Sequence, residues 1–142
     1  AFTMVIATRK GKKKMIVYCR QWQGTSLEPL SPAKVLQEIA IVCARYDLNW
    51  AITDQFAADA MIDLASQCGL ELVVEEWTRK NKVPLFLELA SQFQQGNVVI
   101  PPDHYMLKDL RLVKRRITQG GISIVFPCGS PRSVKVDFRR AY

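Results

Sequence analysis

The sequence predicts an α/β fold in which helices flank a mixed β-sheet, and three observations lead to this prediction. Short β-rich segments alternate with amphipathic helical segments along most of the chain, a pattern typical of layered folds with a partly parallel sheet. The chain opens with two β-rich segments around a polar turn, and such a hairpin adds an antiparallel pair. The 142 residues and 49% hydrophobic content suffice for one domain with its own core.

The first part of the chain is expected to form a hairpin and then a capped helix. The expected segments are the strands Phe2–Thr8 and Met15–Trp22, the turn Arg9–Lys13 with Gly11 between them, and a loop over Gly24–Leu30. Ser31 is a favoured N-cap residue and Pro32 suits the first helical position, so a helix should begin here. Its apolar residues recur at helical spacing: Val35, Leu36, Ile39, Val42, Cys43 and Tyr46.

Alternating strands and helices are expected after this first helix. They are a strand at Asn49–Thr53, a helix at about Gln55–Cys68 ended by Gly69, a strand at Leu70–Val74, a helix capped by Asn81 and stopped by Gly96, a short strand at Val98–Ile100, a helix at about His104–Ile117 broken by Gly120 and Gly121, and a strand at Ile122–Phe126. Val134 and Val136 alternate as in a further strand, which carries Asp137.

The composition narrows the classes of function. A net charge of +7 and a pI near 9.4 are compatible with nucleic acid or with an anionic membrane surface. No apolar run approaches the roughly 20 residues of a transmembrane helix, and no basic region precedes the apolar N-terminal stretch as in a signal peptide. A soluble, intracellular protein is therefore expected. The glycine-rich motifs of nucleotide-binding loops are absent from the sequence.

Cysteine and histidine carry little of the predicted chemistry. The four cysteines are Cys19, Cys43, Cys68 and Cys128. They have neither zinc-motif spacing nor the density of a disulfide framework, so reduced core thiols are favoured over a catalytic or metal role. His104 is the only histidine, which excludes histidine-rich metal sites. No supporting motif places it in a catalytic triad.

An acid at the end of an apolar strand is the main candidate for chemistry. Asp54 closes Trp50–Asp54, directly before a helical segment. It has two interpretations, a helix N-cap or a ligand of a divalent metal at a sheet edge, and the two roles are compatible. Asp59 lies one helical turn further on and is a weaker candidate. Asp137 also stands between a strand and a helical stretch, so the two strand-ending acids could share a metal site.

Basic residues gather in two groups. One crowds the hairpin turn from Arg9 to Lys14. The other is expected along the fourth helix and near the C-terminus, with Lys114, Arg115, Arg116 and Lys135 as candidate DNA contacts. Solvated surface is one interpretation of these residues. Phosphate contact that positions DNA without reading its sequence is the other.

From about Gln21 to Tyr142 the sequence resembles the C-terminal nuclease domain of phage terminase large subunits, which have a ribonuclease H-like fold. The resemblance rests on the order and spacing of four segments: Thr53–Asp59; Trp77, Thr78, Asn81 and Lys82 before Leu85, Leu89 and Gly96; Val98–Asp103 before Leu107, Leu110 and Leu112; and Val136–Phe138 with Ala141. Each motif is loose alone, and their order makes them fairly specific.

The resemblance implies a metal-dependent endonuclease that cuts concatemeric double-stranded viral DNA during genome packaging in the host cytoplasm. It implies Asp54 and Asp137 as catalytic ligands of one or two Mg²⁺ or Mn²⁺ ions, with Asp59 assisting. Lys82 matches a family position and is a candidate DNA contact. Portal protein, the small terminase subunit and an ATPase domain of the parent chain are the implied partners, and no membrane is involved.

One departure from the family affects the expected site. The family's first catalytic acid lies on its first strand, whereas this sequence has no acid before Glu28. The expectation is a single nuclease domain over 1–142, a fragment that lacks the ATPase domain and the first acidic strand. The alternatives are an inactive domain of the same fold that binds DNA or another partner, and another ribonuclease H-like nuclease such as a resolvase or integrase.

Overall fold

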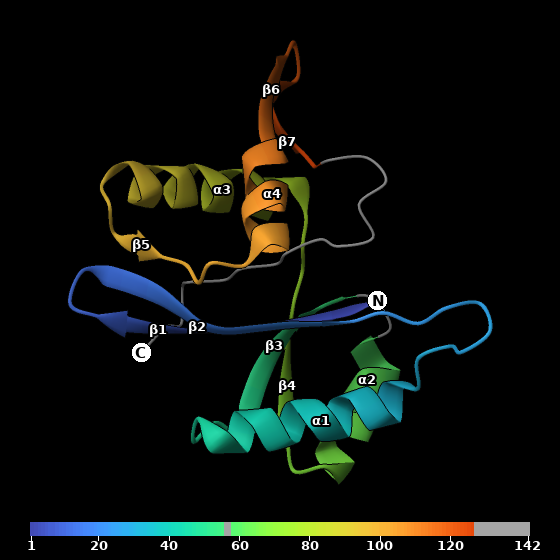
Figure 1. Cartoon of the computed structure of the whole chain (residues 1–142). Helices are drawn as coiled ribbons and strands as arrows, with labels where there is room; N and C mark the ends of the chain where they lie inside the picture. The colour runs from blue at the N-terminus through green and yellow to red at the C-terminus, as the bar shows by residue number, and fades with distance from the viewer. Residues whose placement is uncertain (56–57, 127–142) are drawn as a thin grey trace. The chain divides into compact units, whose positions relative to one another are not determined.

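The computed structural model describes residues 1–55 and 58–126, which form two compact units. One unit comprises Ala1, Thr3–Gln21 and the described residues from Arg79 onward; the other comprises Phe2 and Trp22–Thr78. Figure 1 labels their helices and strands. The described residues contain four helices with both parallel and antiparallel strand pairs, which confirms the predicted α/β class. None of the helices in these described ranges is long and apolar enough to cross a membrane.

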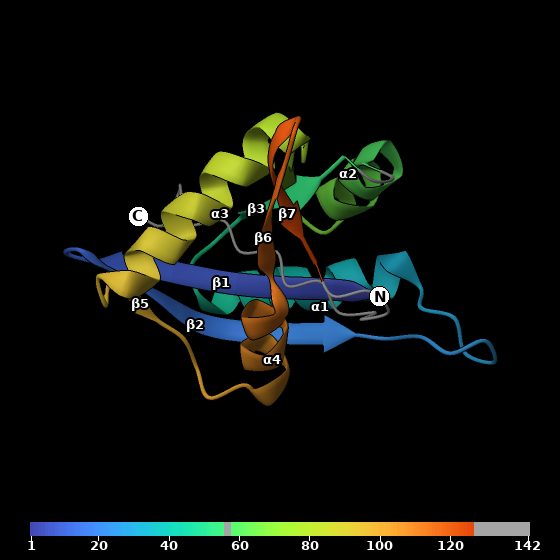
Figure 2. The same cartoon turned by 90° about the horizontal axis from the view of Figure 1, so that it is seen from above.

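The described part of the first unit contains two β-sheets and two helices. Its elements are β1 (Phe2–Lys10), β2 (Lys13–Trp22), α3 (Arg79–Gln94), β5 (Val98–Val99), α4 (His104–Leu112), β6 (Lys114–Thr118) and β7 (Gly121–Val125). The expected hairpin is present as β1 and β2, and β5 adds a parallel strand beside β2 (Figure 2). The antiparallel pair β6–β7 forms a separate sheet that follows α4.

The core of this unit lies between α4 and the first sheet. Met106 of α4 and Ile16 of β2 are 2% and 5% exposed, and they pack with five partly buried neighbours: Val5, Ala7, Cys19, Ile100 and Leu110. Asp103 caps α4, because its Oδ1 accepts a 2.7 Å hydrogen bond from the backbone N–H of Met106. That cap explains why the helix begins at His104, as the sequence predicts.

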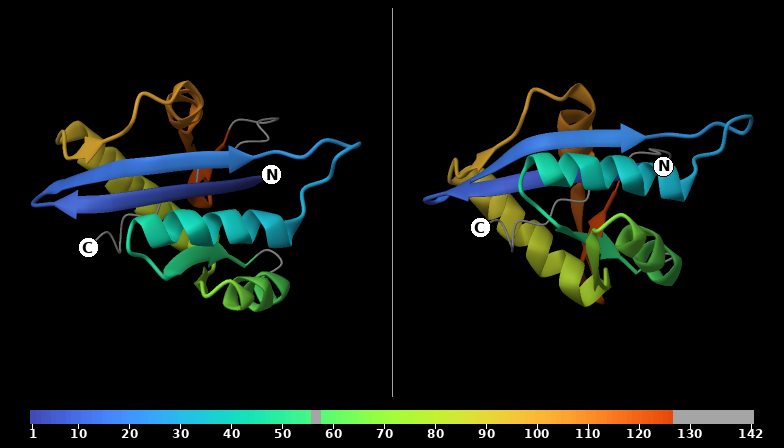
Figure 3. Two further views of the ribbon diagram at one scale, coloured as in Figure 1. Left: turned by 60° about the horizontal axis from the view of Figure 1, so that its bottom comes forward. Right: turned by 90° about the horizontal axis from the view of Figure 1, so that it is seen from below.

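The second unit is a parallel strand pair packed with two helices. Its elements are α1 (Pro32–Arg45), β3 (Trp50–Asp54), α2 (Ala58–Gln67) and β4 (Glu71–Glu75). Ser31 caps α1 and Pro32 opens it, as predicted. Helix α2 packs beside both α1 and β4 (Figure 3). The buried apolar residues of this unit are Trp22, Val35, Leu36, Val42, Cys43, Ala65 and Leu70.

The predicted helix at His104–Ile117 is wrong beyond Leu112. Val113 is extended with φ −66° and ψ 124°, and the next five residues form β6 instead of a further helical turn. The apolar spacing of Met106, Leu110, Val113 and Ile117 fits a helix, but Gln119 and Gly120 form a two-residue loop. Such a loop lets β6 pair immediately with β7, and the antiparallel ladder replaces helical hydrogen bonds.

The predicted start of the third helix is also wrong. Helix α3 begins at Arg79, so Asn81 lies inside it; Thr78, another residue type favoured at N-caps, directly precedes the observed start. Helix α2 is described from Ala58 onward, and Gln55 lies in a bend outside it.

Replacing Gly24 with alanine is expected to destabilise the second unit. A Cβ at this position would lie 2.7 Å from the backbone nitrogen of Leu30 and 3.1 Å from the carbonyl oxygen of Glu28. Because backbone atoms cannot rotate aside, Gly24→Ala should lower the free energy of unfolding by about 1–3 kcal/mol in urea denaturation. Ser26→Ala, at an exposed position of the same loop, is the control. Equal stability of the two variants would contradict the predicted clash.

Candidate functional site

The structure places Asp54 at the carboxyl end of β3, beside an acid of the neighbouring strand. Strands β3 and β4 are parallel and pair residue by residue from Trp50 opposite Glu71 to Asp54 opposite Glu75. Paired residues of a parallel ladder point to the same face, and Asp54 and Glu75 are both half-buried. Two carboxylates therefore share one face at one end of the strand pair.

Glu75 was not singled out from the sequence, although it directly follows the apolar run Leu70–Val74. The signal was present: the two apolar strands are each followed by an acid and are separated by one helix. A strand–helix–strand unit of this kind produces parallel neighbours whose carboxyl ends lie together. The register was not readable from the sequence, because either strand could have shifted along the other.

A hydrogen bond ties the segments that follow the two strands. The side-chain Oε1 of Gln55, the residue after Asp54, accepts a 2.9 Å hydrogen bond from the backbone N–H of Trp77. Trp77 lies two residues beyond Glu75. This bond holds Gln55, directly after β3, against Trp77, which follows β4. It therefore helps to fix the two strand ends that carry Asp54 and Glu75.

The weaker candidate Asp59 lies where its negative charge can stabilise helix α2. It is exposed and lies in the first turn of α2, where a negative charge interacts favourably with the helix dipole. Within residues 1–55 and 58–126, no group of three or more histidine, cysteine or acidic residues is arranged to hold a metal ion. Asp137 lies outside the described residues, so its approach to Asp54 stays a prediction.

The basic candidates Lys114, Arg115 and Arg116 are all exposed on β6. The sequence predicts a helix at these residues, and the structure has a strand instead. Alternation along a strand places Lys114 and Arg116 on one face of the hairpin and Arg115 on the other. The hairpin thus carries positive charge on both faces. Lys135 lies outside the described residues.

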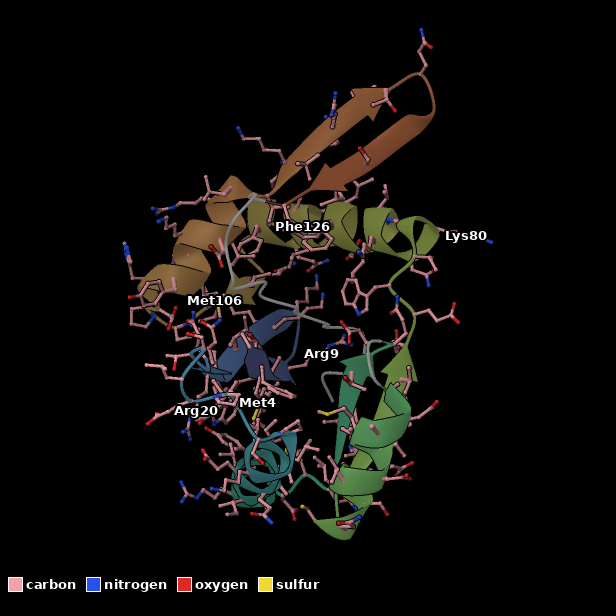
Figure 4. All side chains as sticks on the ribbon, turned by 90° about the vertical axis from the view of Figure 1, so that its right-hand side faces the viewer. Met4, Arg9, Arg20, Lys80, Met106 and Phe126 are labelled. Carbon is pink, nitrogen blue, oxygen red and sulfur yellow. The ribbon has the colours of Figure 1, made fainter. Side chains whose placement is uncertain are left out.

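Lys82 has a packing role at the base of this hairpin. Its Nζ lies 5.8 Å from the centroid of the Phe126 ring, within the range of a cation–π interaction. Phe126 also meets Phe86 of α3 edge-to-face, with ring centroids 5.3 Å apart. Figure 4 shows Phe126 against α3, whereas Lys80 extends away from the start of that helix. Contact of Lys82 with DNA remains a prediction.

The cysteines of the described residues are free thiols, and Cys43 is buried as expected. Burial raises the pKa of Cys43, which keeps it protonated and unreactive. The pKa of Cys19 is raised as well, first by burial and then by the negative charge and hydrogen bonding of Asp103. The Sγ of Cys19 lies 3.8 Å from Oδ2 of Asp103. Cys128 lies outside the described residues.

The fold is similar to solved structures of phage large terminases. No protein-family model matches the sequence, and no curated protein matches it. The crystal structure of the large terminase nuclease from thermophilic phage G20c matches with a TM-score of 0.64 and 16% identity, over 87% of this chain and 70% of that chain. The same nuclease with bound cobalt matches with a TM-score of 0.65 and 15% identity, over 92% and 73%.

The HK97 bacteriophage large terminase matches with a TM-score of 0.72 and 15% identity, over 87% of this chain. The match covers 32% of the HK97 chain, so this chain spans about a third of that protein's length. At these identities the likeness establishes the fold. The chain has the ribonuclease H-like α/β fold of phage large terminase nucleases, as its sequence motifs indicate.

Cys19 should become more reactive when the charge of Asp103 is removed. Asp103→Asn keeps a side-chain oxygen that can cap α4 but removes the anion that raises the pKa of Cys19. The pKa should fall, so a larger fraction of Cys19 is thiolate at mildly alkaline pH. Alkylation by iodoacetamide, followed for this residue by mass spectrometry, should be several-fold faster. An unchanged rate, matching the control Asp59→Asn, would contradict this electrostatic coupling.

Proposed function

We propose that this chain is the nuclease domain of a phage terminase large subunit and that it hydrolyses phosphodiester bonds of double-stranded DNA. The observation that carries the proposal is the position of Asp54 at the carboxyl end of β3, opposite Glu75, in a fold shared with terminase nucleases. The fold likeness supports the class of reaction, and the paired strand ends supply acids suited to it.

The donor chemistry at this strand end fits a hard divalent cation. Carboxylate oxygens are the ligands that Mg²⁺ and Mn²⁺ prefer, and the related G20c nuclease has been crystallised with cobalt. Asp54 and Asp137 are the proposed ligands, Glu75 adds negative charge beside Asp54, and Asp59 is a weaker contributor. One or two Mg²⁺ or Mn²⁺ ions would supply Lewis-acid activation of water and stabilisation of the leaving oxygen.

The proposed substrate is concatemeric viral DNA, cut during genome packaging in the host cytoplasm. Exposed Lys114, Arg115 and Arg116 on β6, with Lys135 and Lys82, are the proposed contacts to its phosphates. An ATPase domain in the parent protein, the small terminase subunit and the portal protein are the proposed partners. In this proposal the 142 residues are one nuclease domain within a longer chain.

Cleavage of double-stranded DNA by the full-length protein with Mn²⁺ tests the proposal. Asp54→Asn should reduce the rate by at least about 100-fold, because even outer-shell changes around a metal cost about 10–100-fold. Glu75→Gln should cause a smaller loss, because it removes charge beside Asp54 but keeps a residue of the same size. Cleavage of linear or plasmid DNA, followed on gels over time, gives the rates.

Asp47→Asn is the matched control. Asp47 is an exposed acid of the same unit with φ +57°, a left-handed conformation that asparagine tolerates well. The Asp47→Asn variant should cleave DNA at the same rate as the parent protein. Full activity in both Asp54→Asn and Asp137→Asn would refute the proposed ligands. DNA binding without any Mn²⁺-dependent cleavage would favour a non-catalytic module, and preference for branched DNA would favour a resolvase-like nuclease.

A further inference from the structure

The turn between β1 and β2 carries the densest positive charge of the chain. Five of the six residues from Arg9 to Lys14 are basic, and the first acid in the sequence is Glu28. Four of the five side chains are exposed: Arg9, Lys10, Lys12 and Lys13. Figures 1 and 3 show this turn as the closed end of the blue hairpin. The feature is therefore an exposed, strongly cationic tip.

The fold does not require these charges. The two-residue loop needs Gly11, whose φ of +59° suits glycine at the first loop position. The strand beyond the loop is held through its backbone, because the N–H of Lys14 donates a 2.7 Å hydrogen bond to the carbonyl oxygen of Asn97. Polar uncharged side chains at positions 12 and 13 would leave both features intact.

The charges are also unfavourable in the hairpin alone. Lys10 and Lys13 flank the two-residue loop on neighbouring strands, and like charges facing each other across strands are destabilising. In the described ranges 1–55 and 58–126, no carboxylate forms an ion pair with Lys10, Lys12 or Lys13. Arg9 uses one of its five N–H donors on the carbonyl oxygen of Gly11, at 2.9 Å. A polyanionic partner would offset this repulsion.

We infer that the β1–β2 turn is a second contact to the phosphate backbone of double-stranded DNA, separate from the β6–β7 hairpin. The inference rests on the proposed function, because it takes the DNA substrate as the partner. The turn has no aromatic residue on which an unpaired base could stack, which disfavours single strands. It has no apolar residue to enter a membrane interface, which disfavours lipid. The contact is sequence-independent and strengthens as the salt concentration falls.

The test is DNA binding by the full-length protein in EDTA, so that cleavage does not contribute. Lys12→Gln/Lys13→Gln should weaken binding to a double-stranded oligonucleotide by on the order of tenfold at 0.1 M salt. The slope of log K against log salt should fall by about one for each lost phosphate contact. Fluorescence anisotropy over a range of salt concentrations gives both quantities.

Two variants control for net charge and for the kind of contact. Lys34→Gln/Arg45→Gln removes the same charge from exposed positions of α1 and should change binding much less. Lys12→Arg/Lys13→Arg keeps both charges and should retain the affinity. The inference is overturned if the Lys34/Arg45 variant loses as much affinity as the turn variant, or if the arginine variant loses as much as the glutamine variant.

The identity of the partner is read in the same assay. Binding to single-stranded DNA, RNA or anionic vesicles that depends on the turn, while duplex binding does not, would overturn the assignment to duplex DNA. Failure of the proposed function has a different signature, namely absence of Mn²⁺-dependent cleavage by the parent protein. No variant should melt below the parent, since the replaced side chains are exposed, and the glutamine variant of the turn is expected to melt at the same or a slightly higher temperature because it loses like-charge repulsion.

Discussion

The parallel pairing of β3 with β4 is the constraint on which the candidate site depends. Five consecutive residue pairs set the register, and the last of them places Asp54 opposite Glu75. Side chains alternate along a strand, so a slip of one residue would move one acid to the opposite face. Two contacts outside the ladder also stabilise this register. Helix α2 packs beside β4, and the backbone N–H of Trp77 donates a hydrogen bond to the side chain of Gln55.

Much of the fold could be predicted because its signals are local. Ser31 and Pro32 specify the start of α1, and glycines end α2 and α3 with φ of +73° at Gly69 and +68° at Gly96. The position of Asp54 at a strand end was equally local, because it needed only an apolar run that stops at an acid. These features depend on neighbours in the sequence, which sequence patterns report well.

The features that were missed depend on pairing between segments. Lys114–Arg116 consists of good helix formers, yet β7 folds back on it and makes it a strand. Glu75 lies opposite Asp54 because of the register between β3 and β4. Neither strand's own sequence contains that register. Lys82 resembled a DNA contact in sequence, whereas its contact with the Phe126 ring is visible only in three dimensions. All three features arise from contacts between segments that are separate in the sequence.

Anomalous diffraction from crystals of the full-length protein soaked in Mn²⁺ tests the metal role of Asp54 most directly. We expect an anomalous peak about 2 Å from a carboxylate oxygen of Asp54, a distance typical of small hard cations. The peak should lie on the face of β3 and β4 that carries Glu75. Mn²⁺ bound only at other sites in an active enzyme, with the Asp54 carboxylate uncoordinated, would refute the proposed metal role of Asp54.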